Sequence, residues 1–303
     1  NEANPLEEDL IIVDEASMLD ISLFYHLLCA LKDGARLILV GDIDQLPPVG
    51  AGEPLKDLMS WGYVPIVRLK RIFRQEEGSG IVENAALIRK GEMCVPDEAG
   101  EFRIVYAADD EDAYRIVMDL CRELNYGNEE NKMLLQVLSP MYRGVCGVDH
   151  LNESLQEMIH GEKVPDGMKF FPGDKVMQTR NDYEKGIYNG DVGTVWTATP
   201  QKVFVRYFDK EVVYEGQERF DLRLAYAVTV HKSQGSEYET VIFILRPSQH
   251  NMLQRNLLYT GVTRARKNTI LVTAPDALRR ALAIQHTGNR YSLFLPFLNH
   301  EAL

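Results

Sequence analysis

The sequence lacks the features of a membrane protein or of a secreted, disulfide-stabilised protein. No apolar run approaches the roughly 18 to 20 residues that a membrane-spanning helix needs, and the N-terminal residues are acidic and polar, unlike a signal peptide. The four cysteines lie far apart, without a CxxC pair or metal-ligand spacing. We therefore expect a cytoplasmic protein with free thiols, without a membrane contact, a disulfide or a zinc site.

An excess of basic residues is also missing. The formal net charge is −12, which by itself argues against a general nucleic-acid binder. The charge is unevenly distributed, because residues 97–130 carry eleven acids and three bases, whereas residues 223–270 carry seven bases and two acids. We interpret the first block as a solvated helix face. The second block predicts a local basic surface that is compatible with a DNA groove.

The Gly-Lys dipeptide is a third absence, and with it the phosphate loop G-x-x-x-x-G-K-[ST]. The start of the chain nevertheless has the pattern of a nucleotide site. An apolar run leads directly into Asp14-Glu15, as a buried parallel strand does when it delivers two carboxylates to its C-terminal end. Such a pair typically serves the metal ion and the attacking water of a bound nucleotide. The alternative is an acid pair that caps a helix after the strand.

Apolar periodicity predicts an α/β protein with parallel sheets and an inserted β-barrel. Residues 169–222 carry short alternating runs and Gly, Asn and Asp turns without a helical pattern, which indicates a small antiparallel barrel inserted in the second α/β unit. The expected strands before the barrel are 9–15, 35–42, 63–69, 101–107 and 133–140. After it we expect a strand that starts at 224 and breaks at Thr229, and strands 240–245 and 268–274. The expected helices are 20–32, capped by Asp20, and 79–92, 110–124, 147–161 and 250–264.

Three strings in this framework carry polar residues with candidate roles. Gln45 follows a strand, Gly-Asp and a Pro-rich loop, where its amide can sense a terminal phosphate. Arg74, in "IFRQ", can neutralise charge on a transferring phosphoryl group, and Arg264 can supply a second arginine. Each has a simpler alternative: an ordinary Pro-terminated loop, a surface arginine, and a basic helix C-terminus favoured by the helix dipole.

The string "VTVHKSQGSE" (228–237) is dense in hydrogen-bond donors. Thr229, His231 and Lys232 follow a strand end and suit contacts to a nucleic-acid backbone. Gly235 permits a tight turn, and Glu237 could accept a hydrogen bond from a ribose hydroxyl. In the predicted barrel, the aromatic residues Tyr183, Tyr188 and Trp196 either stack on bases or fill the small core.

Taken together, these strings resemble motifs II to VI of superfamily 1 helicases, and most closely the RecD/TraA-like branch. The strings that carry the resemblance are "VDEASML", "GDIDQLPPVG", "IFRQ", "NGDVGTV" (189–195), "VTVHKSQGSE" and "YTGVTRA". The resemblance covers roughly residues 10–275. It implies two RecA-like domains, with residues 1–66 ending the first, residues 67–166 and 223–303 forming the second, and residues 167–222 forming the inserted barrel.

The resemblance also implies roles for individual residues. Asp14 would hold Mg²⁺ and Glu15 would activate water, while Gln45, Arg74 and Arg264 would contact the γ-phosphate of ATP. In the same way Gly235, Glu237 and Arg264 would line the nucleotide site. Single-stranded DNA would lie near Thr229, His231, Lys232, Tyr188 and Asn189. The implied movement is 5′ to 3′.

Because the phosphate loop is absent, the resemblance predicts a fragment that begins inside the first RecA-like domain. The missing N-terminal half of the same protein is then its first partner, and a natural partial helicase gene is the alternative. We expect negligible ATPase activity from the fragment alone, since ATP would be held mainly from one side. Two other functions stay open: a non-catalytic DNA-binding module and a subunit of a recombination nuclease complex, with other recombination or repair subunits as partners.

Overall fold

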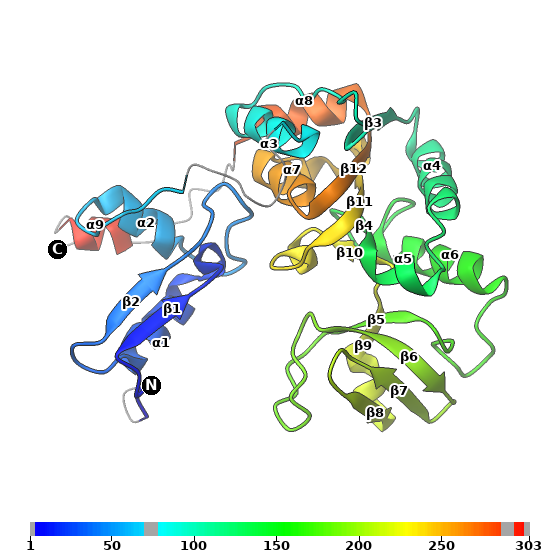
Figure 1. The fold of residues 1–303 in the computed structure, drawn as a ribbon, viewed down its shortest axis with the longest axis horizontal. Coiled ribbons are helices and arrows are strands. Elements are labelled where there is room, and N and C mark those ends of the chain that lie inside the picture. The colour runs from blue at the N-terminus through cyan, green and yellow to red at the C-terminus, as the bar shows by residue number, and fades with distance from the viewer. Residues whose placement is uncertain (1–3, 70–77, 286–293, 300–303) are drawn as a thin grey trace.

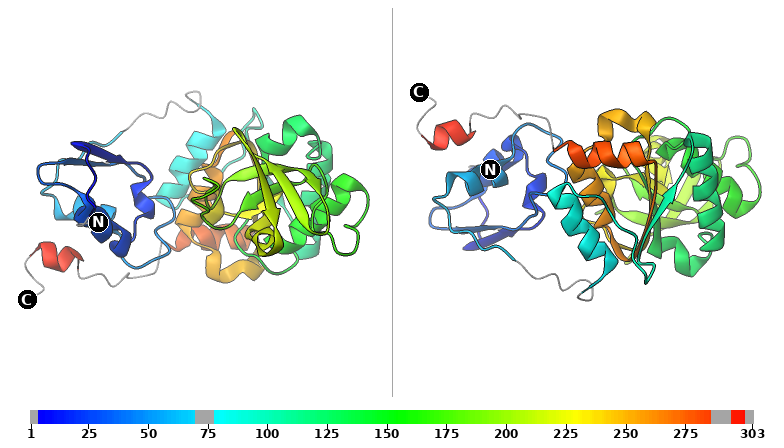
Figure 2. Two further views of the ribbon diagram at one scale, coloured as in Figure 1. Left: turned by 90° about the horizontal axis from the view of Figure 1, so that it is seen from below. Right: turned by 90° about the horizontal axis from the view of Figure 1, so that it is seen from above.

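The computed structural model describes residues 4–69, 78–285 and 294–299. Figure 1 shows an N-terminal lobe, a larger α/β domain beside it, and an antiparallel barrel attached to the α/β domain. Figure 2 shows that the C-terminal helix α9 (Phe294–Leu298) lies with the N-terminal lobe, and the Phe294 ring contacts Phe24 edge-on at 5.8 Å. No helix in these described ranges is long and apolar enough to cross a membrane.

The N-terminal lobe is a β-α-β unit followed by a short helix. Strand β1 (Leu10–Val13) pairs in parallel with β2 (Arg36–Leu39), and α1 (Ile21–Ala30) connects them. Asp20 caps α1 by accepting a hydrogen bond from the Leu23 amide at 2.8 Å, as the sequence predicts. The 3₁₀ turn η1 (Ala16–Met18) follows β1, and α2 (Pro54–Trp61) follows the loop after β2.

Two predictions for this lobe are wrong. Residues 63–69 form no strand. Pro65 cannot donate to a strand ladder, and Val67 is exposed rather than paired in a sheet. Strands β1 and β2 are also half exposed rather than buried, with Ile12 61% and Ile38 45% exposed, because one face of this two-stranded sheet is uncovered by the described residues.

The α/β domain is a five-stranded parallel sheet in the order β10-β4-β11-β12-β3. Its central strand β11 alternates, so that Val241 and Phe243 pack in one hydrophobic cluster and Ile242 and Ile244 in the other. Helices therefore cover both faces. The strands are β3 (Phe102–Tyr106), β4 (Leu135–Ser139), β10 (Ala227–Thr229), β11 (Tyr238–Leu245) and β12 (Ala265–Thr273).

Helices α3, α7 and α8 contribute to the first cluster, and α4 and α6 to the second. The bounds are α3 (Gly80–Lys90), α4 (Asp110–Glu123), α5 (Glu129–Leu134), α6 (Val148–His160), α7 (Arg255–Val262) and α8 (Pro275–Ala283). The helix expected over 250–264 is divided into the 3₁₀ turn η4 (Pro247–Met252) and α7. A further 3₁₀ turn, η3 (His231–Ser233), follows β10.

The barrel is a five-stranded antiparallel sheet in the order β8-β7-β6-β5-β9. Its strands are β5 (Lys175–Gln178), β6 (Val192–Ala198), β7 (Lys202–Arg206), β8 (Glu211–Glu215) and β9 (Leu222–Leu224), with the 3₁₀ turn η2 (Gly216–Asp221) before β9. Gly193 has a packing role, because a Cβ atom there would lie 2.6 Å from Val205 Cγ1. The exact domain limits stay a prediction.

A buried carboxylate holds the barrel to the α/β domain. Asp174, which precedes β5, is fully buried. Its carboxylate accepts hydrogen bonds from the Gln156 amide at 2.5 Å, the Phe171 backbone N–H at 2.7 Å and the Tyr226 hydroxyl at 2.9 Å, and contacts His160 Nε2 at 2.8 Å. These groups come from α6, from the segment before β5 and from the segment before β10, so the carboxylate joins both connections of the barrel.

The neighbouring Lys175, the first residue of β5, is also fully buried. Its ammonium group donates to the Leu135 carbonyl at 3.2 Å and to Gln136 Oε1 at 2.9 Å, and it lies over the rings of Tyr126 and Tyr238. No carboxylate is among these partners. Burial therefore lowers the pKa of Lys175 from 10.5 to about 7.

This buried lysine predicts a pH-dependent stability. Between about pH 7 and 10.5 the unfolded chain binds a proton at Lys175 that the folded chain does not, so the free energy of unfolding rises with pH in that window. Replacing Lys175→Met should flatten the slope between pH 7 and pH 9, measured by urea unfolding. The exposed Lys202→Met, which loses only an ion pair with Glu215, should keep it. An unchanged slope in Lys175→Met would contradict the assignment.

Candidate functional site

The first candidate feature is the acidic turn after β1. Asp14 is exposed and Glu15 is half buried. Glu15 has φ 51° and ψ 36°, the left-handed conformation that non-glycine residues seldom adopt. Its N–H donates to Asp14 Oδ1 at 2.8 Å, and the next N–H, from Ala16, donates to the Val40 carbonyl at 2.8 Å. The strained turn thus holds both carboxylates at the carboxyl end of the parallel strands.

The donor set of this turn fits a magnesium ion that is shared with a nucleotide. Mg²⁺ prefers oxygen ligands and is usually held by one or two carboxylates plus substrate phosphates, rather than by a complete protein cage. Asp14 supplies an exposed carboxylate. Within the described residues, three or more His, Cys, Asp or Glu side chains nowhere form a metal-binding group. Asp14 as the ligand of the ion stays a prediction.

The loop after β2 contacts the α/β domain through Leu46. Leu46 is 4% exposed and belongs to the hydrophobic cluster of the α/β domain, although it is part of the N-terminal lobe. Its N–H donates to Thr260 Oγ1 on α7 at 2.8 Å, and its carbonyl accepts from Gln234 Nε2 at 3.1 Å. Both backbone polar groups of Leu46 are thus paired with side chains of the other domain.

Two acids of the same loop are also paired across the domains. The Tyr259 hydroxyl donates to Asp42 Oδ2 at 2.9 Å, and Arg89 Nε lies 2.6 Å from Asp44 Oδ2. Asp42 Oδ1 accepts from the Asp44 N–H at 3.0 Å, which keeps the turn compact. Burial, and then the Asp42 carboxylate, raise the pKa of Tyr259, so the phenol stays protonated and donates.

Gln45 lies between these contacts. Its carbonyl is 3.5 Å from Asn256 Nδ2 on α7. Its side-chain Oε1 atom is buried and has no hydrogen-bond partner among the described residues, and the same holds for Asn256 Oδ1. A buried amide oxygen without a partner is unusual in a folded protein and requires an explanation. A ligand group or a change in domain position could satisfy it.

The predicted arginine pair is only partly observable. Arg74 lies outside the described residues. Arg264 is 2% exposed, and its guanidinium group donates to the carbonyls of Thr260 at 3.1 Å and Ser236 at 3.2 Å and to Thr263 Oγ1 at 3.4 Å. In this conformation Arg264 joins the end of α7 to the loop after η3.

The two other predicted nucleotide-site residues lie in that loop. Gly235 has φ 75°, the left-handed conformation that the tight turn requires. Glu237 Oε2 lies 2.6 Å from Arg266 Nε, and the Glu237 side chain is 21% exposed. The ribose contact of Glu237 therefore stays a prediction, since here its carboxylate forms an ion pair.

Of the predicted DNA-contacting residues, Thr229, His231 and Lys232 lie together at the end of β10, Asn189 reaches them from the barrel, and the Tyr188 ring packs against Tyr183 in the barrel. The Lys232 N–H donates to Thr229 Oγ1 at 3.2 Å, and Lys232 Nζ donates to Asn189 Oδ1 in the barrel at 2.5 Å. Asn189 is oriented by its N–H, which donates to Asn181 Oδ1 at 2.9 Å. Burial lowers the pKa of His231, so the ring is neutral near pH 7.

Thr229, His231, Lys232 and Asn189 line a cleft of about 780 Å³. Because β10 and β4 pair in parallel with Thr229 opposite Ser139, the segments after both strands meet at one edge of the sheet. The cleft is lined by those two segments, by the barrel turn at Asn189 and by two apolar residues of the N-terminal lobe, Met18 and Val49. It thus extends from one lobe to the other.

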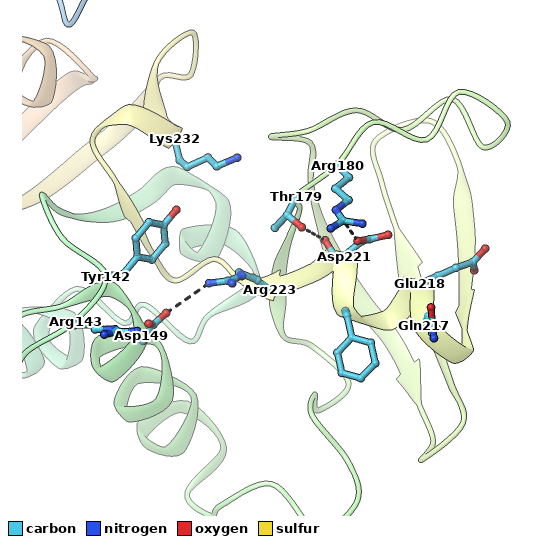
Figure 3. A pocket seen from close by; sticks show the side chains of 11 residues that line it. Tyr142, Arg143, Asp149, Thr179, Arg180, Gln217, Glu218, Asp221, Arg223 and Lys232 are labelled. Carbon is cyan, nitrogen blue, oxygen red and sulfur yellow. Dashed lines mark hydrogen bonds and ion pairs between the residues drawn. The ribbon is translucent and has the colours of Figure 1, made fainter. Parts of the chain in front are cut away.

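A second cleft of about 1000 Å³ lies between the α/β domain and the barrel (Figure 3). It shares Tyr142, Arg143 and Lys232 with the first cleft. Its remaining lining residues are Asp149, Thr179, Arg180, Gln217, Glu218, Phe220, Asp221 and Arg223. Figure 3 shows two dashed contacts: Arg223 on β9 with Asp149 on α6, at 3.8 Å, and Arg180 with Asp221 within the barrel, at 3.5 Å. We call the two connected clefts the groove.

Several groove residues were not among the sequence-based candidates. Tyr142 and Arg143 are an aromatic residue and a basic residue that follow the end of a strand. This pattern in the sequence could have identified them as candidates for nucleic-acid binding. Arg180, Phe220 and Arg223 carry no local signal, because only the barrel fold brings them together. Of the barrel aromatics, Trp196 is 55% exposed beneath the Arg206 guanidinium, so the alternative that it fills the core is wrong.

Comparison with known families matches successive parts of the chain. The family of AAA domains matches residues 2–103, and the SH3 domain of the ATP-dependent RecD-like DNA helicases matches residues 151–207. The UvrD-like helicase C-terminal domain matches residues 224–272. The second of these matches overlaps the observed barrel, and the third contains η3, α7 and Arg264.

Curated relatives match nearly the whole chain. It is 37% identical to the ATP-dependent RecD2 DNA helicase of Deinococcus radiodurans, over 97% of this chain and 40% of the relative. It is 33% identical to the RecBCD enzyme subunit RecD of Mycolicibacterium smegmatis, over 96% of this chain and 55% of that relative. The chain thus spans about half the length, or less, of these relatives.

Solved structures support the fold. The Pif1 helicase of Candida albicans has a TM-score of 0.59 at 20% identity, covering 93% of this chain and 74% of that one. A Bacteroides Pif1 helicase has a TM-score of 0.58 at 21% identity, covering 91% and 72%. The predicted RecA-like α/β fold with an inserted antiparallel sheet is therefore confirmed. Because the RecD-type barrel and the flanking helicase segments match in one order along one chain, we conclude that the chain belongs to the RecD-like branch of the superfamily 1 DNA helicases.

Proposed function

We propose that this chain is the C-terminal part of an ATP-dependent helicase that moves 5′ to 3′ along single-stranded DNA. ATP would be hydrolysed between two RecA-like domains, in a longer protein whose N-terminal half completes the first domain. The observation that carries the proposal is the contact of the Gln45 loop with α7 and with Gln234, directly after η3, which joins the proposed phosphate-sensing loop to a groove suited to DNA. The direction rests on the RecD-like resemblance.

In this proposal the acidic turn and the arginines act on opposite sides of the nucleotide. Bound Mg²⁺-ATP would supply the phosphoryl group, with the ion neutralising its charge. Asp14 would hold the ion, and Glu15 would orient the attacking water and accept its proton. Gln45, Arg74 and Arg264 would contact the γ-phosphate and stabilise the charge that develops there.

Arg264 must exchange partners to act in this way. Its guanidinium group here donates to backbone carbonyls of Thr260 and Ser236. Arginine has five N–H donors, so part of the fork can turn to a phosphate while the rest stays bonded to the protein. The buried Oε1 atom of Gln45 has no hydrogen-bond partner among the described residues. A changed domain position would give this atom a hydrogen-bond donor.

Single-stranded DNA would follow the groove. Tyr142 and Phe220 offer ring faces to bases, and Arg143, Arg180 and Lys232 offer cations to phosphates. Phosphate contacts would supply most of the affinity despite the net charge of −12, because attraction depends on the local field of the groove. Tyr188 and Asn189 would contact the strand where the barrel meets the α/β domain.

Removing one groove cation should weaken DNA binding in a salt-dependent way. The Arg180 side chain is 79% exposed, and its ion pair with Asp221 is long, with 3.5 Å between Nε and Oδ1. The guanidinium group is therefore available to a phosphate. Arg180→Gln should lower the affinity for a short oligo(dT), and the log–log salt slope should decrease by about 0.7 for one lost contact. Arg115→Gln on α4, which removes a similar exposed arginine outside the groove, is the control.

Fluorescence anisotropy over a range of salt concentrations measures both quantities. Equal losses of affinity in Arg180→Gln and Arg115→Gln would show that only the net charge of the protein matters, and would exclude Arg180 from the DNA track.

An aromatic groove residue should contribute through stacking. Phe220 is 71% exposed and lines the second cleft. Phe220→Ala should cost about 1 to 3 kcal/mol of binding free energy, with an unchanged salt slope, because stacking involves no charge. Phe208→Ala removes a more exposed ring of the barrel that does not line the groove, and it should bind DNA like the wild type. Equal affinities for both variants would contradict the stacking role.

ATP hydrolysis should require the N-terminal half of the protein. We expect negligible phosphate release from this chain alone with single-stranded DNA. The longer protein should hydrolyse ATP and unwind a duplex with a 5′ overhang but not a 3′ overhang. Glu15→Gln should abolish both activities, because it removes the base for the attacking water. Malachite-green phosphate detection and gel-based unwinding measure them.

Glu8→Gln, an exposed residue before β1, is the matched control. Clear turnover by this chain alone that is lost in Glu15→Gln would contradict the need for the N-terminal half. Tight DNA binding without any ATP hydrolysis by the longer protein would favour the second candidate, a DNA-binding module.

Partnership with recombination or repair subunits is a separate proposal. Its support is that the Mycolicibacterium smegmatis relative is named a subunit of the RecBCD enzyme. Cytoplasmic location likewise stays an expectation from the sequence.

A further inference from the structure

Leu46 lies where three segments with separate proposed roles meet. It follows Gln45 directly in the chain, so a shift of Leu46 moves the proposed phosphate sensor. Its N–H is bonded to Thr260, whose carbonyl in turn accepts from Arg264 Nε at 3.1 Å. Its carbonyl is bonded to Gln234, in the same short segment as the groove residues His231 and Lys232.

The Leu46 contact contains more interactions than are needed to hold the two domains together. Burying the Leu46 side chain in the α/β core would already hold the lobes together. Here two side chains from different segments also bond the two backbone polar groups, so the position of Leu46 is defined along both segments at once. Thr260 is fully buried, so water cannot replace its hydroxyl without an opening of the contact.

The other contacts of the loop are more exposed and therefore easier to exchange. Arg89 and Asp44 are 57% and 39% exposed, so their ion pair is screened by water. The Tyr259–Asp42 bond lies in a half-buried environment. Leu46 is the buried contact of the loop, and the exposed outer pairs can exchange partners when Leu46 shifts.

We propose that Leu46, Thr260 and Gln234 form a coupling joint that transmits DNA occupancy of the groove to Gln45. This inference rests on the proposed helicase function. A DNA strand that contacts the segment after β10 displaces Gln234 and, through it, Leu46. Gln45 and the Arg264 end of α7 then move together toward the geometry for hydrolysis. Thr260 is a positioning residue in this scheme, because it contacts neither nucleotide nor DNA.

The test uses the longer protein and an isosteric variant. Thr260→Val keeps the shape of the side chain and removes the acceptor for the Leu46 N–H. DNA-free ATP hydrolysis and the affinity for oligo(dT) should stay within twofold of the wild type. The stimulation of hydrolysis by DNA should fall about fivefold or more, the lower end of typical coupling between two sites. Thr260→Ser keeps the hydroxyl and should retain the stimulation.

Thr269→Val is the matched control for losing a buried hydroxyl. Thr269 is also fully buried in the α/β domain, but its hydroxyl bonds within that domain, to the Val262 carbonyl. It should keep the stimulation. Hydrogen–deuterium exchange supplies a second readout: the peptide that contains Leu46 should exchange faster in Thr260→Val and at the wild-type rate in Thr269→Val. This readout does not depend on catalysis.

The outcomes separate the joint from the helicase function itself. Wild-type stimulation by DNA that persists in Thr260→Val would overturn the joint and leave the proposed function standing. Unchanged exchange at Leu46 would overturn it as well, because the predicted bond would then be unimportant for the contact. A wild-type protein that hydrolyses no ATP would contradict the proposed function, and the joint with it.

Discussion

The insertion of Leu46 into the core of the α/β domain is the constraint on which the arrangement of this chain depends. The N-terminal lobe is a two-stranded sheet with a half-exposed face, and it buries little apolar surface of its own. Its position therefore depends on the loop after β2, where one leucine supplies the apolar contact and its backbone groups are both paired. The proposed halves of the nucleotide site are placed relative to each other by this contact.

The barrel is held by a different kind of contact. Asp174 and Lys175 are adjacent and fully buried, and both are bonded to groups of the α/β domain, so the barrel meets that domain through buried polar groups. Such groups are costly unless their geometry is satisfied, which disfavours alternative orientations. Because the groove has one wall on each domain, this junction and the Lys232–Asn189 bond set the path available to DNA.

Regular elements were predictable where a local pattern was strong. The alternation along β11, the Asp20 cap and Gly91 at the end of α3 each depend on neighbours in the chain. Helix α2 was missed although Pro54 at its start and Gly62 after its end are usable signals. The strand expected over 63–69 failed because a β-branched run does not supply the sheet neighbour that a strand requires.

The sequence by itself determined the family, the order of the domains and the strand ends that carry polar residues, because motifs and periodicity are local properties. Tertiary structure decided which of those residues meet. The pairing of Leu46 with Thr260, the carbonyl partners of Arg264 and the ion pair of Glu237 were not visible in the motifs. The groove joins Tyr142 to Phe220 only because the barrel folds back on the α/β domain. Contacts between residues far apart in the chain depend on packing, and no local pattern records them.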